Sequence, residues 1–322
     1  MADGRWRVLN LADVSAFPDV FDEVLPLADV VTLEPDPQTL ATQMPHFDAY
    51  FASLHVRLTR ETIATSPCLR VIVTPSTGLD HIDMAAAQER GVAVLSLRGE
   101  TQFLDSITCT AEMAWGLMLA VVRRLPWSFE AAKRGEWARD RFRGHQLSGK
   151  TFGTLGYGRL GRIVAQYARA FRMRVLACDV REVTPEPGVE LVDFDTLLRE
   201  SDVLAINIHL TDENRHLIGA AEFARMKPTA WLINTSRGGI IDEEAFVAAL
   251  EKSAIAGAGV DVIEGEWRDD LADHPLIRYA KTHENLVISP HTGGVTVEAQ
   301  RMTIEFMVRK LIAFMEARDD QE

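Results

Sequence analysis

Residues 151–161 read TFGTLGYGRLG, and this short stretch decides the fold. An apolar, strand-like run leads into Gly156, Gly158 and Gly161, and a helical pattern follows over 159–171. A strand, a Gly-x-Gly-x-x-Gly turn and a helix in this order form the dinucleotide-binding fingerprint. The first glycine permits a tight turn, the second lets a pyrophosphate approach, and the third lets helix and strand pack closely. The alternative is a glycine-rich turn with a packing role alone.

The identity of the dinucleotide depends on the next strand, which we expect over 173–178. Asp179 follows that strand, 18 residues after Gly161. A carboxylate there accepts hydrogen bonds from the adenosine ribose hydroxyls and repels a 2′-phosphate, while the helix N-terminus binds the pyrophosphate. We therefore expect NAD(H) in preference to NADP(H), with Arg181 as a nearby cation that could favour a phosphate.

Strand-like runs and helical patterns alternate along the rest of the chain. Strands are expected at 6–9, 30–33, 49–54, 69–74, 92–95, 151–155, 173–178, 203–206, 231–233, 257–262 and 286–289. Helices are expected at 60–65, 84–89, 106–124, 159–171, 194–199, 220–226, 243–252 and 296–315, with a helix and a loop over 127–149. This alternation is typical of parallel sheets covered by helices. The fold class is therefore α/β with doubly wound parallel sheets.

Length and composition exclude several other classes of protein. The 322 residues suggest two domains, and 47% apolar with 25% charged residues is close to the globular average. The longest apolar run, 113–122, is too short to span a bilayer, and the N-terminus lacks the apolar core of a signal peptide. We expect a cytoplasmic protein.

Charge and cysteine content limit the ligands. The net charge of −13 disfavours binding to nucleic acid. Cys68, Cys109 and Cys178 form no Cys-x-x-Cys pair, and the histidines show no metal-ligand spacing, so we expect no metal site.

Three segments carry polar residues just after expected strands, where ligands bind in open α/β sheets. They are INTSRGGIIDEE at 233–244, GAGVDVIEGE at 257–266 and SPHTGG at 289–294. A histidine such as His291 suits proton transfer near neutral pH, and a carboxylate such as Glu266 can orient it. The guanidinium of Arg237 suits a carboxylate beside a carbonyl. Together they predict oxidation of an alcohol, or reduction of a carbonyl, beside a nicotinamide.

Simpler roles for these residues stay open. Arg237 could cap a helix or pair with Asp242, Glu266 could belong to a plain acidic loop, and His291 could be a structural or solvated histidine.

Five sequence blocks together resemble the D-isomer-specific 2-hydroxyacid dehydrogenases, a family that includes D-3-phosphoglycerate dehydrogenase and glyoxylate/hydroxypyruvate reductase. They are TPSTGLDHID at 74–83, TAEMAWGLMLAVVRRLP at 110–126, TLGYGRLGR at 154–162, LTDENRHLI at 210–218 with INTSRGGIIDEE, and GAGVDVIEGE with SPHTGG. The resemblance covers roughly residues 50–312. It implies two Rossmann-like domains with the active site in the cleft between them: a discontinuous substrate domain, 1–106 with 294–322, and an NAD-binding domain, 107–293.

The resemblance also implies residue roles. Arg237, Glu266 and His291 would be catalytic, with Arg237 binding the substrate carboxylate. Further substrate contacts would come from His55, Ser76, Thr77 and Gly78. Cofactor contacts would come from Gly156, Tyr157, Gly158, Arg159, Leu160, Gly161, Asp179, Asn207, Thr235, Ser236, Asp261 and Gly294.

The family resemblance implies hydride transfer between NAD(H) and C2 of a small D-2-hydroxy or 2-keto acid, in a homodimer joined through 107–149. Three departures from the family pattern are Trp267 and His209, where proline is common, and a longer segment at 96–110. Two alternatives remain: a non-catalytic, NAD(H)-binding corepressor on this fold, and an enzyme for an unusual substrate such as formate or phosphite.

Overall fold

The structure, a computed structural model, describes residues 5–268 and 270–319. The chain divides into two compact units. The first combines residues up to Ser106 with those from Val295 onward, and the second is Ile107–Gly294. Gly294, which the sequence analysis placed in the first unit, falls in the second. Within the described parts of the chain, none of the helices combines the length and apolar character needed to cross a membrane.

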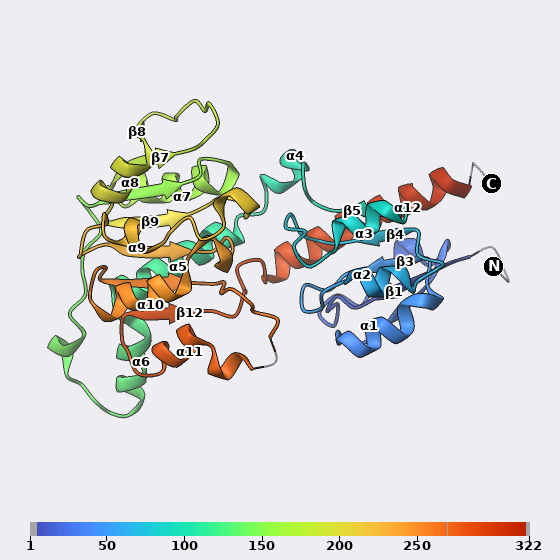
Figure 1. The fold of residues 1–322 in the computed structure, drawn as a ribbon, viewed down its shortest axis with the longest axis horizontal. Coiled ribbons are helices and arrows are strands. Elements are labelled where there is room, and N and C mark those ends of the chain that lie inside the picture. Colours follow the sequence, from blue (N-terminus) through green and yellow to red (C-terminus); the bar gives the residue numbers. More distant parts are fainter. Residues whose placement is uncertain (1–4, 269, 320–322) are drawn as a thin grey trace. The chain divides into compact units, whose positions relative to one another are not determined.

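The first unit is built on a five-stranded sheet in the order β2-β1-β3-β4-β5, with every neighbouring pair parallel. Its strands are β1 (Trp6–Asn10), β2 (Ala28–Thr32), β3 (Ala49–Phe51), β4 (Val71–Val73) and β5 (Ala93–Leu95). Its helices are α1 (Pro37–Gln43), α2 (Arg60–Ala64), α3 (Met84–Glu89), α4 (Thr101–Leu104) and α12 (Val297–Asp319), with short 3-10 turns at Asp22–Val24 and Met44–His46 (Figure 1). The central strands β3 and β4 are buried along their whole length, as parallel strands covered on both faces must be.

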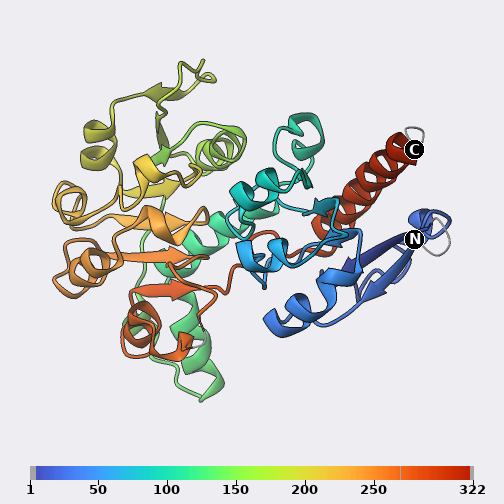
Figure 2. The same ribbon diagram turned by 45° about the vertical axis from the view of Figure 1, so that its right-hand side comes forward.

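The second unit contains a seven-stranded parallel sheet in the order β12-β11-β10-β9-β6-β7-β8 (Figure 2). Its strands are β6 (Thr151–Leu155), β7 (Arg174–Cys178), β8 (Val189–Leu191), β9 (Val203–Ile206), β10 (Trp231–Asn234), β11 (Gly257–Val260) and β12 (Leu286–Ile288). Its helices are α5 (Cys109–Val122), α6 (Leu125–Lys133), α7 (Arg159–Ala170), α8 (Phe194–Glu200), α9 (Ala220–Phe223), α10 (Glu243–Glu251) and α11 (Pro275–Ala280). Short 3-10 turns lie at Arg139–Phe142, Asp212–Asn214, Gly238–Ile240 and Leu271–Asp273. The two parallel sheets confirm the predicted fold class.

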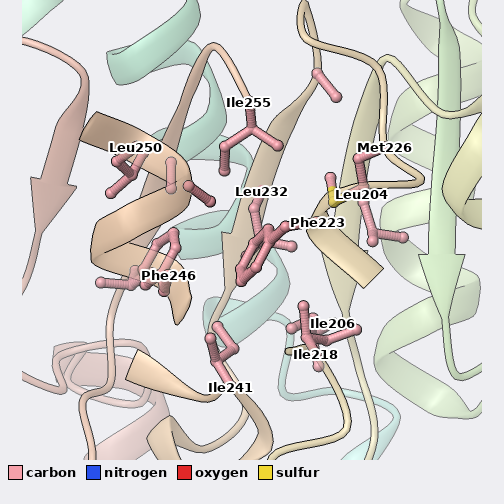
Figure 3. Packing of buried hydrophobic residues seen from close by; sticks show 14 of the residues in the cluster. Leu204, Ile206, Ile218, Phe223, Met226, Leu232, Ile241, Phe246, Leu250 and Ile255 are labelled. Carbon is pink, nitrogen blue, oxygen red and sulfur yellow. The ribbon is translucent and has the colours of Figure 1, made fainter. Parts of the chain in front are cut away.

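The core of the second unit follows the period of two along its strands. On β9, Leu204 and Ile206 face one hydrophobic cluster, while Val203 and Ala205 face another that includes residues of α5 and α7. Figure 3 shows the first cluster, where the parallel rings of Phe223 and Phe246 stack with centroids 5.6 Å apart. Burial on both faces explains why these strands are continuously apolar in sequence.

The topology brings the polar segments of the second unit to one edge. All seven strands run in the same direction, and the strand order reverses between β6 and β9. The segments that follow β6, β7, β9, β10, β11 and β12 therefore leave the sheet at the same edge. This is where open α/β sheets bind ligands.

The structure corrects several predicted elements. The helix expected over 106–124 is shorter, and the helix expected within 127–149, α6, begins earlier, at Leu125. The break falls at Arg124, whose φ of +55° is left-handed, and Pro126 lies in the first turn of α6 rather than only ending its predecessor. The short elements α1, α4, α11 and β8 were not predicted. Each spans seven residues or fewer, which is too short for a clear hydrophobic period.

Candidate active site

The three glycines of the turn after β6 have different surroundings. A Cβ atom at Gly156, where φ is +95°, would lie 2.3 Å from the carbonyl oxygen of Asn207. A Cβ atom at Gly161 would lie 2.1 Å from the carbonyl oxygen of Gly156. At Gly158, the nearest atom would be Nη2 of Arg181, 3.5 Å away. Packing therefore requires the first and third glycines, whereas the backbone at the second is open, as the approach of a pyrophosphate requires.

The N-terminus of α7 suits the same anion. Gly158 is the N-cap and has no side chain to cap the helix. The first N–H groups, those of Arg159, Leu160 and Gly161, have no acceptor within the helix, and the helix dipole makes this end positive. The Arg159 side chain donates to the carbonyl oxygen of Ile107 over 2.5 Å and so ties the helix start to the segment before α5.

Two side chains hold the glycine turn in shape: Thr154, which the sequence analysis did not predict as a site residue, and the partly buried Asn207, which it predicted only by resemblance. The Asn207 amide donates to Thr154 Oγ1 over 3.0 Å, and the Thr154 hydroxyl donates to the carbonyl oxygen of Gly156 over 2.8 Å. Thr154 is fully buried within β6. Its role could not be seen in the sequence, because a threonine in a buried strand has no distinctive pattern.

Asp179 lies at the end of β7, where the sequence analysis expected a ribose-binding carboxylate. Its Oδ2 accepts the backbone N–H of Tyr157 over 2.8 Å, which joins the carboxylate to the glycine turn. The Arg181 guanidinium forms two further hydrogen bonds with it, at 2.9 and 2.8 Å. This contact with Arg181 holds the pKa of Asp179 well below its usual range. The carboxylate is therefore ionised at neutral pH and is partly neutralised by a neighbouring cation.

Tyr157 itself contributes its backbone rather than its ring. Its side chain is buried, with its hydroxyl accepting the N–H of Glu186 over 3.2 Å and the guanidinium of Arg162 4.4 Å from its ring centroid.

Arg237 follows β10 in a turn that is held by hydrogen bonds from its own residues. Asn234, fully buried, accepts the N–H of Ser236 over 3.0 Å and donates to the carbonyl oxygen of Arg237 over 2.9 Å. The Ser236 hydroxyl donates to the carbonyl oxygen of Ile206 over 2.8 Å, which fastens the turn to β9. Thr235 lies buried between these residues. Arg237 Nη1 donates to the carbonyl oxygen of Ser236 over 2.7 Å.

His291 and Glu266 are brought into contact from segments 25 residues apart, with His291 Nδ1 2.8 Å from Glu266 Oε1. Because a carboxylate oxygen can only accept, Nδ1 carries a proton, and Nε2 is the nitrogen that can exchange a proton with a ligand. The His291 side chain is 31% exposed and that of Glu266 only 16%. A half-buried imidazole with a more deeply buried carboxylate behind it is suited to general acid–base chemistry.

The turn that carries His291 is strained and is held by Asp261. His291 has a φ of +54°, a left-handed conformation that costs a non-glycine residue energy. Asp261, 2% exposed at the end of β11, accepts the hydroxyl of Ser289 and the N–H groups of Thr292 and Gly293 at 2.5, 2.9 and 2.7 Å. Its backbone carbonyl accepts the N–H of His291 over 2.8 Å. The proposed cofactor residue Asp261 therefore has a clear role in fixing the acid–base turn.

Gly294 follows this turn, and a Cβ atom there would meet no other atom within 4 Å.

The substrate residues expected in the first unit follow β3 and β4. The Ser76 hydroxyl donates to the carbonyl oxygen of Gly78 over 2.6 Å, so its one proton is used. The contact between Ser76 and Thr74 at 3.2 Å must then have Thr74 as its donor. Thr74 in turn must accept from Nε2 of the buried His81, 3.0 Å away. Hydrogen bonds donated in turn by His81, Thr74 and Ser76 thus shape the turn over residues 76–78.

His55, the remaining expected substrate residue, lies after β3 in an exposed position. Its backbone N–H donates to the hydroxyl of the buried Ser53 over 3.1 Å, which fixes the start of this loop.

Comparison with known proteins identifies the family of the chain. Residues 115–293 match the family model described as D-isomer specific 2-hydroxyacid dehydrogenase, NAD binding domain. The chain is 35% identical to the hydroxypyruvate reductase of Thermotoga maritima over 83% of this chain and 85% of that protein. It is also 35% identical to the glyoxylate reductase of Aeropyrum pernix over 98% of this chain and 94% of that protein.

Among solved structures, it resembles D-lactate dehydrogenase from Aquifex aeolicus complexed with NAD and lactic acid. The TM-score is 0.83 at 27% identity, over 98% of this chain and 97% of that one. The family resemblance found in the sequence is thereby confirmed. The chain belongs to the D-isomer specific 2-hydroxyacid dehydrogenase family, with the NAD-binding domain of that family in its second unit.

Proposed function

We propose that this chain transfers a hydride between NAD(H) and C2 of a small D-2-hydroxy or 2-keto acid. The observation that carries the proposal is the 2.8 Å contact between His291 Nδ1 and Glu266 Oε1. It lies at the edge of the sheet that also carries Arg237 and the glycine turn around Gly158. A proton-transfer pair, a guanidinium and a pyrophosphate cradle at one edge are the parts that this reaction needs.

The mechanism follows from the hydrogen-bond directions. The glycine turn around Gly158 and Asp179 would hold NADH, which would supply the hydride to C2 in the reductive direction. His291 donates the Nε2 proton to the developing alkoxide oxygen and keeps its Nδ1 proton on Glu266. Glu266 stabilises the imidazolium before this transfer and holds the ring in one orientation throughout. In oxidation, His291 Nε2 accepts the hydroxyl proton.

Arg237 would bind the substrate by its guanidinium. A planar pair of N–H donors matches a carboxylate and the adjacent carbonyl oxygen, and its positive charge favours the oxyanion that develops there. The turn over Ser76, Thr77 and Gly78 would bind a substrate carboxylate through its backbone N–H groups. We assign the substrate-binding role to the first unit for this reason, with His55 as a further contact.

The test is an assay with NADH and a series of small 2-keto acids, including glyoxylate, hydroxypyruvate and pyruvate. We expect turnover of at least one of them, and a loss of about 100-fold or more in kcat for His291→Asn, since general acid–base catalysis contributes this much. Arg237→Ala should raise KM for the keto acid and also lower kcat, because the lost guanidinium both binds the carboxylate and favours the developing oxyanion. Binding of NADH without turnover of any 2-keto acid would contradict the proposal.

A matched control is available in the first unit. Asp36 caps α1 by accepting the N–H groups of Gln38 and Thr39 at 2.9 and 3.1 Å, and it has no place in the proposed machinery. Asp36→Ala should lower stability by about 1 kcal/mol and leave kcat and KM unchanged. This variant separates loss of chemistry from general loss of folded protein.

We also propose a preference for NAD(H) over NADP(H). Asp179 is ionised and adjoins the glycine turn, which supports recognition of ribose hydroxyls. Its pairing with Arg181 weakens the repulsion of a 2′-phosphate, so the preference should be moderate. Asp179→Ala, which leaves Arg181 without its carboxylate partner, should shift the preference towards NADPH. Equal kcat/KM values for NADH and NADPH in the wild-type enzyme would contradict the proposal.

The chain is further proposed to form a homodimer through 107–149. Two large apolar side chains of this segment are exposed, Phe129 by 58% and Trp137 by 87%. Exposed aromatic residues close in sequence are typical of interaction surfaces. Sedimentation velocity should give a dimer, and Trp137→Asp should weaken it. A monomeric wild-type protein at micromolar concentration would refute this assignment.

A further inference from the structure

A buried histidine and a partly buried glutamate that the proposed chemistry does not use hold the backbone of Glu264, two residues before Glu266. Glu243 Oε1, at the start of α10, accepts the backbone N–H of Glu264 over 2.7 Å. Nε2 of His274, just before α11, lies 3.0 Å from the carbonyl oxygen of the same residue. His274 is only 1% exposed, and burial raises the pKa of Glu243. Both groups are thus largely withdrawn from solvent, and this costs free energy unless their hydrogen bonds offset it.

The direction of each hydrogen bond can be assigned. His274 Nδ1 accepts the backbone N–H of Leu276 over 3.3 Å, so it is unprotonated and the ring proton lies on Nε2. Nε2–H then donates to the carbonyl oxygen of Glu264, with Oε2 of Glu243 3.1 Å away as a second acceptor. The carboxylate and the imidazole thus hold both polar groups of one residue's backbone and contact each other.

The side chain of Glu264 is held as well. Its Oε1 accepts from Arg215 Nη1 over 2.5 Å, and its Oε2 lies 2.7 Å from His216 Nε2. Every polar group of Glu264 therefore has a partner. These bonds connect the loop after β11 to the segment after β9 and to the starts of α10 and α11.

Residue 264 also touches the turn that carries Arg237. A Cβ atom at Gly238 would lie 2.1 Å from the carbonyl carbon of Ile263 and 2.2 Å from the nitrogen of Glu264. At Gly239 it would lie 3.3 Å from Glu264 Oε1. The backbone after Arg237 thus lies directly against residues 263 and 264. Glu266, the partner of His291, lies two residues farther along the same loop.

We infer that Glu243 and His274 are positioning residues that hold Glu264 so that Arg237 and the Glu266–His291 pair keep their relative places. This inference rests on the proposed function. A displacement of about 1 Å in a catalytic group can reduce the rate about 100-fold, so loss of one of these bonds should slow the chemical step. It should leave binding of NADH unchanged, because the glycine turn lies after a different strand.

Two substitutions of His274 separate positioning from simple stability. In His274→Asn, the amide oxygen can replace Nδ1 as the acceptor for Leu276, but the shorter side chain does not reach Glu264. In His274→Gln, the amide nitrogen can replace Nε2 as the donor to Glu264, but no acceptor remains for Leu276. Each variant loses the hydrogen bonding of one ring nitrogen, and both should melt at similar, lowered temperatures.

The kinetic results should differ between the two. We expect His274→Asn to lose about 10- to 100-fold in kcat with an unchanged KM for NADH, and His274→Gln to stay within about threefold of the wild type. Glu243→Gln, which still accepts the Glu264 N–H but cannot accept from His274, should fall between them. It also serves as the variant of choice if the His274 substitutions do not fold.

Amide hydrogen exchange of the protein without cofactor gives a readout independent of activity. The peptide containing residues 263–266 should be protected in the wild type and in His274→Gln, and should exchange faster in His274→Asn. Equal kcat and equal exchange in the two His274 variants would overturn the inference, as would rates that simply follow melting temperature. If the wild type reduced no 2-keto acid, the proposed function would fail, and the exchange experiment would still decide whether His274 holds this loop.

Discussion

Substitution of Thr74 by valine tests the hydrogen-bonded series that shapes the substrate turn. The Thr74 side chain is fully buried, accepts from His81 Nε2 over 3.0 Å and donates to Ser76 Oγ over 3.2 Å. Valine has nearly the same volume and no hydroxyl, so the change removes both bonds and little else. It deprives the buried His81 Nε2–H of this acceptor.

The magnitude follows from the two lost bonds. A buried donor that loses its acceptor costs about 1–3 kcal/mol, and a second neutral hydrogen bond contributes about 0.5–1.5 kcal/mol. Thr74→Val should therefore lower the free energy of unfolding of the first unit by about 1.5–4.5 kcal/mol. Thr74→Ser keeps the hydroxyl and loses one methyl group, which should cost about 1 kcal/mol.

Urea denaturation followed by amide exchange in peptides of the first unit measures this difference directly. The same two variants should separate in steady-state kinetics. With Thr74→Val, the Ser76 side chain loses its donor and the turn to Gly78 loosens, so KM for the keto acid should rise about tenfold, which corresponds to about 1.4 kcal/mol. If Thr74→Val proved as stable as Thr74→Ser, the assigned directions of these hydrogen bonds would be wrong.

Three further results are expected. Gly158→Ala should fold normally, since a Cβ atom fits there, but should raise KM for NADH. Gly161→Ala should destabilise the protein, because its Cβ would lie 2.1 Å from a carbonyl oxygen. Equal melting temperatures of the two variants would count against the roles given to these glycines. The lowered pKa of Asp179 means that its contribution to stability is present above its unfolded value near 3.8 and is lost as pH falls below it. The difference in melting temperature between the wild type and Asp179→Asn should thus be constant from pH 5 to 8 and shrink below pH 4; a difference that instead changed near neutral pH would contradict the assignment. Asp261→Asn should cost about 2–3 kcal/mol, because its amide would face the N–H of Gly293, and should lower kcat as the His291 turn relaxes; an unchanged kcat would argue against this anchoring role.

The fold was largely predictable because its signals are local and repeated. The glycine turn, the apolar strands of the second sheet and the helix after Gly158 follow from patterns within a few residues of each other. The predicted strands overlap the observed ones, although several end one or more residues earlier, as β3 does at Phe51. The short strand β8 was missed because its sequence, Val-Glu-Leu, contains too few residues to show a period.

The candidate site was predictable only in part, for a physical reason. Residues such as Arg237 and His291 follow strands directly, so strand positions and parallel topology already indicate their common edge. The supporting contacts join segments far apart in sequence: Glu243 reaches residue 264, and His274 reaches back to it. No local pattern distinguishes these side chains from an ordinary helix cap or surface charge. Asp261 is similar, because only the structure shows its carboxylate holding the turn around His291.

The most direct test of the proposed reaction follows the hydride by deuterium labelling and the proton transfer by a His291 variant. The protein is incubated with NADH deuterated at C4 of the nicotinamide and with the better of pyruvate and hydroxypyruvate, whose products are chiral at C2, and the product is analysed by mass spectrometry and chiral chromatography. We expect a D-2-hydroxy acid with deuterium at C2, formed at least about 100-fold more slowly by His291→Asn. An L-product, a product without deuterium at C2, or an unchanged rate in the His291 variant would contradict the proposed chemistry.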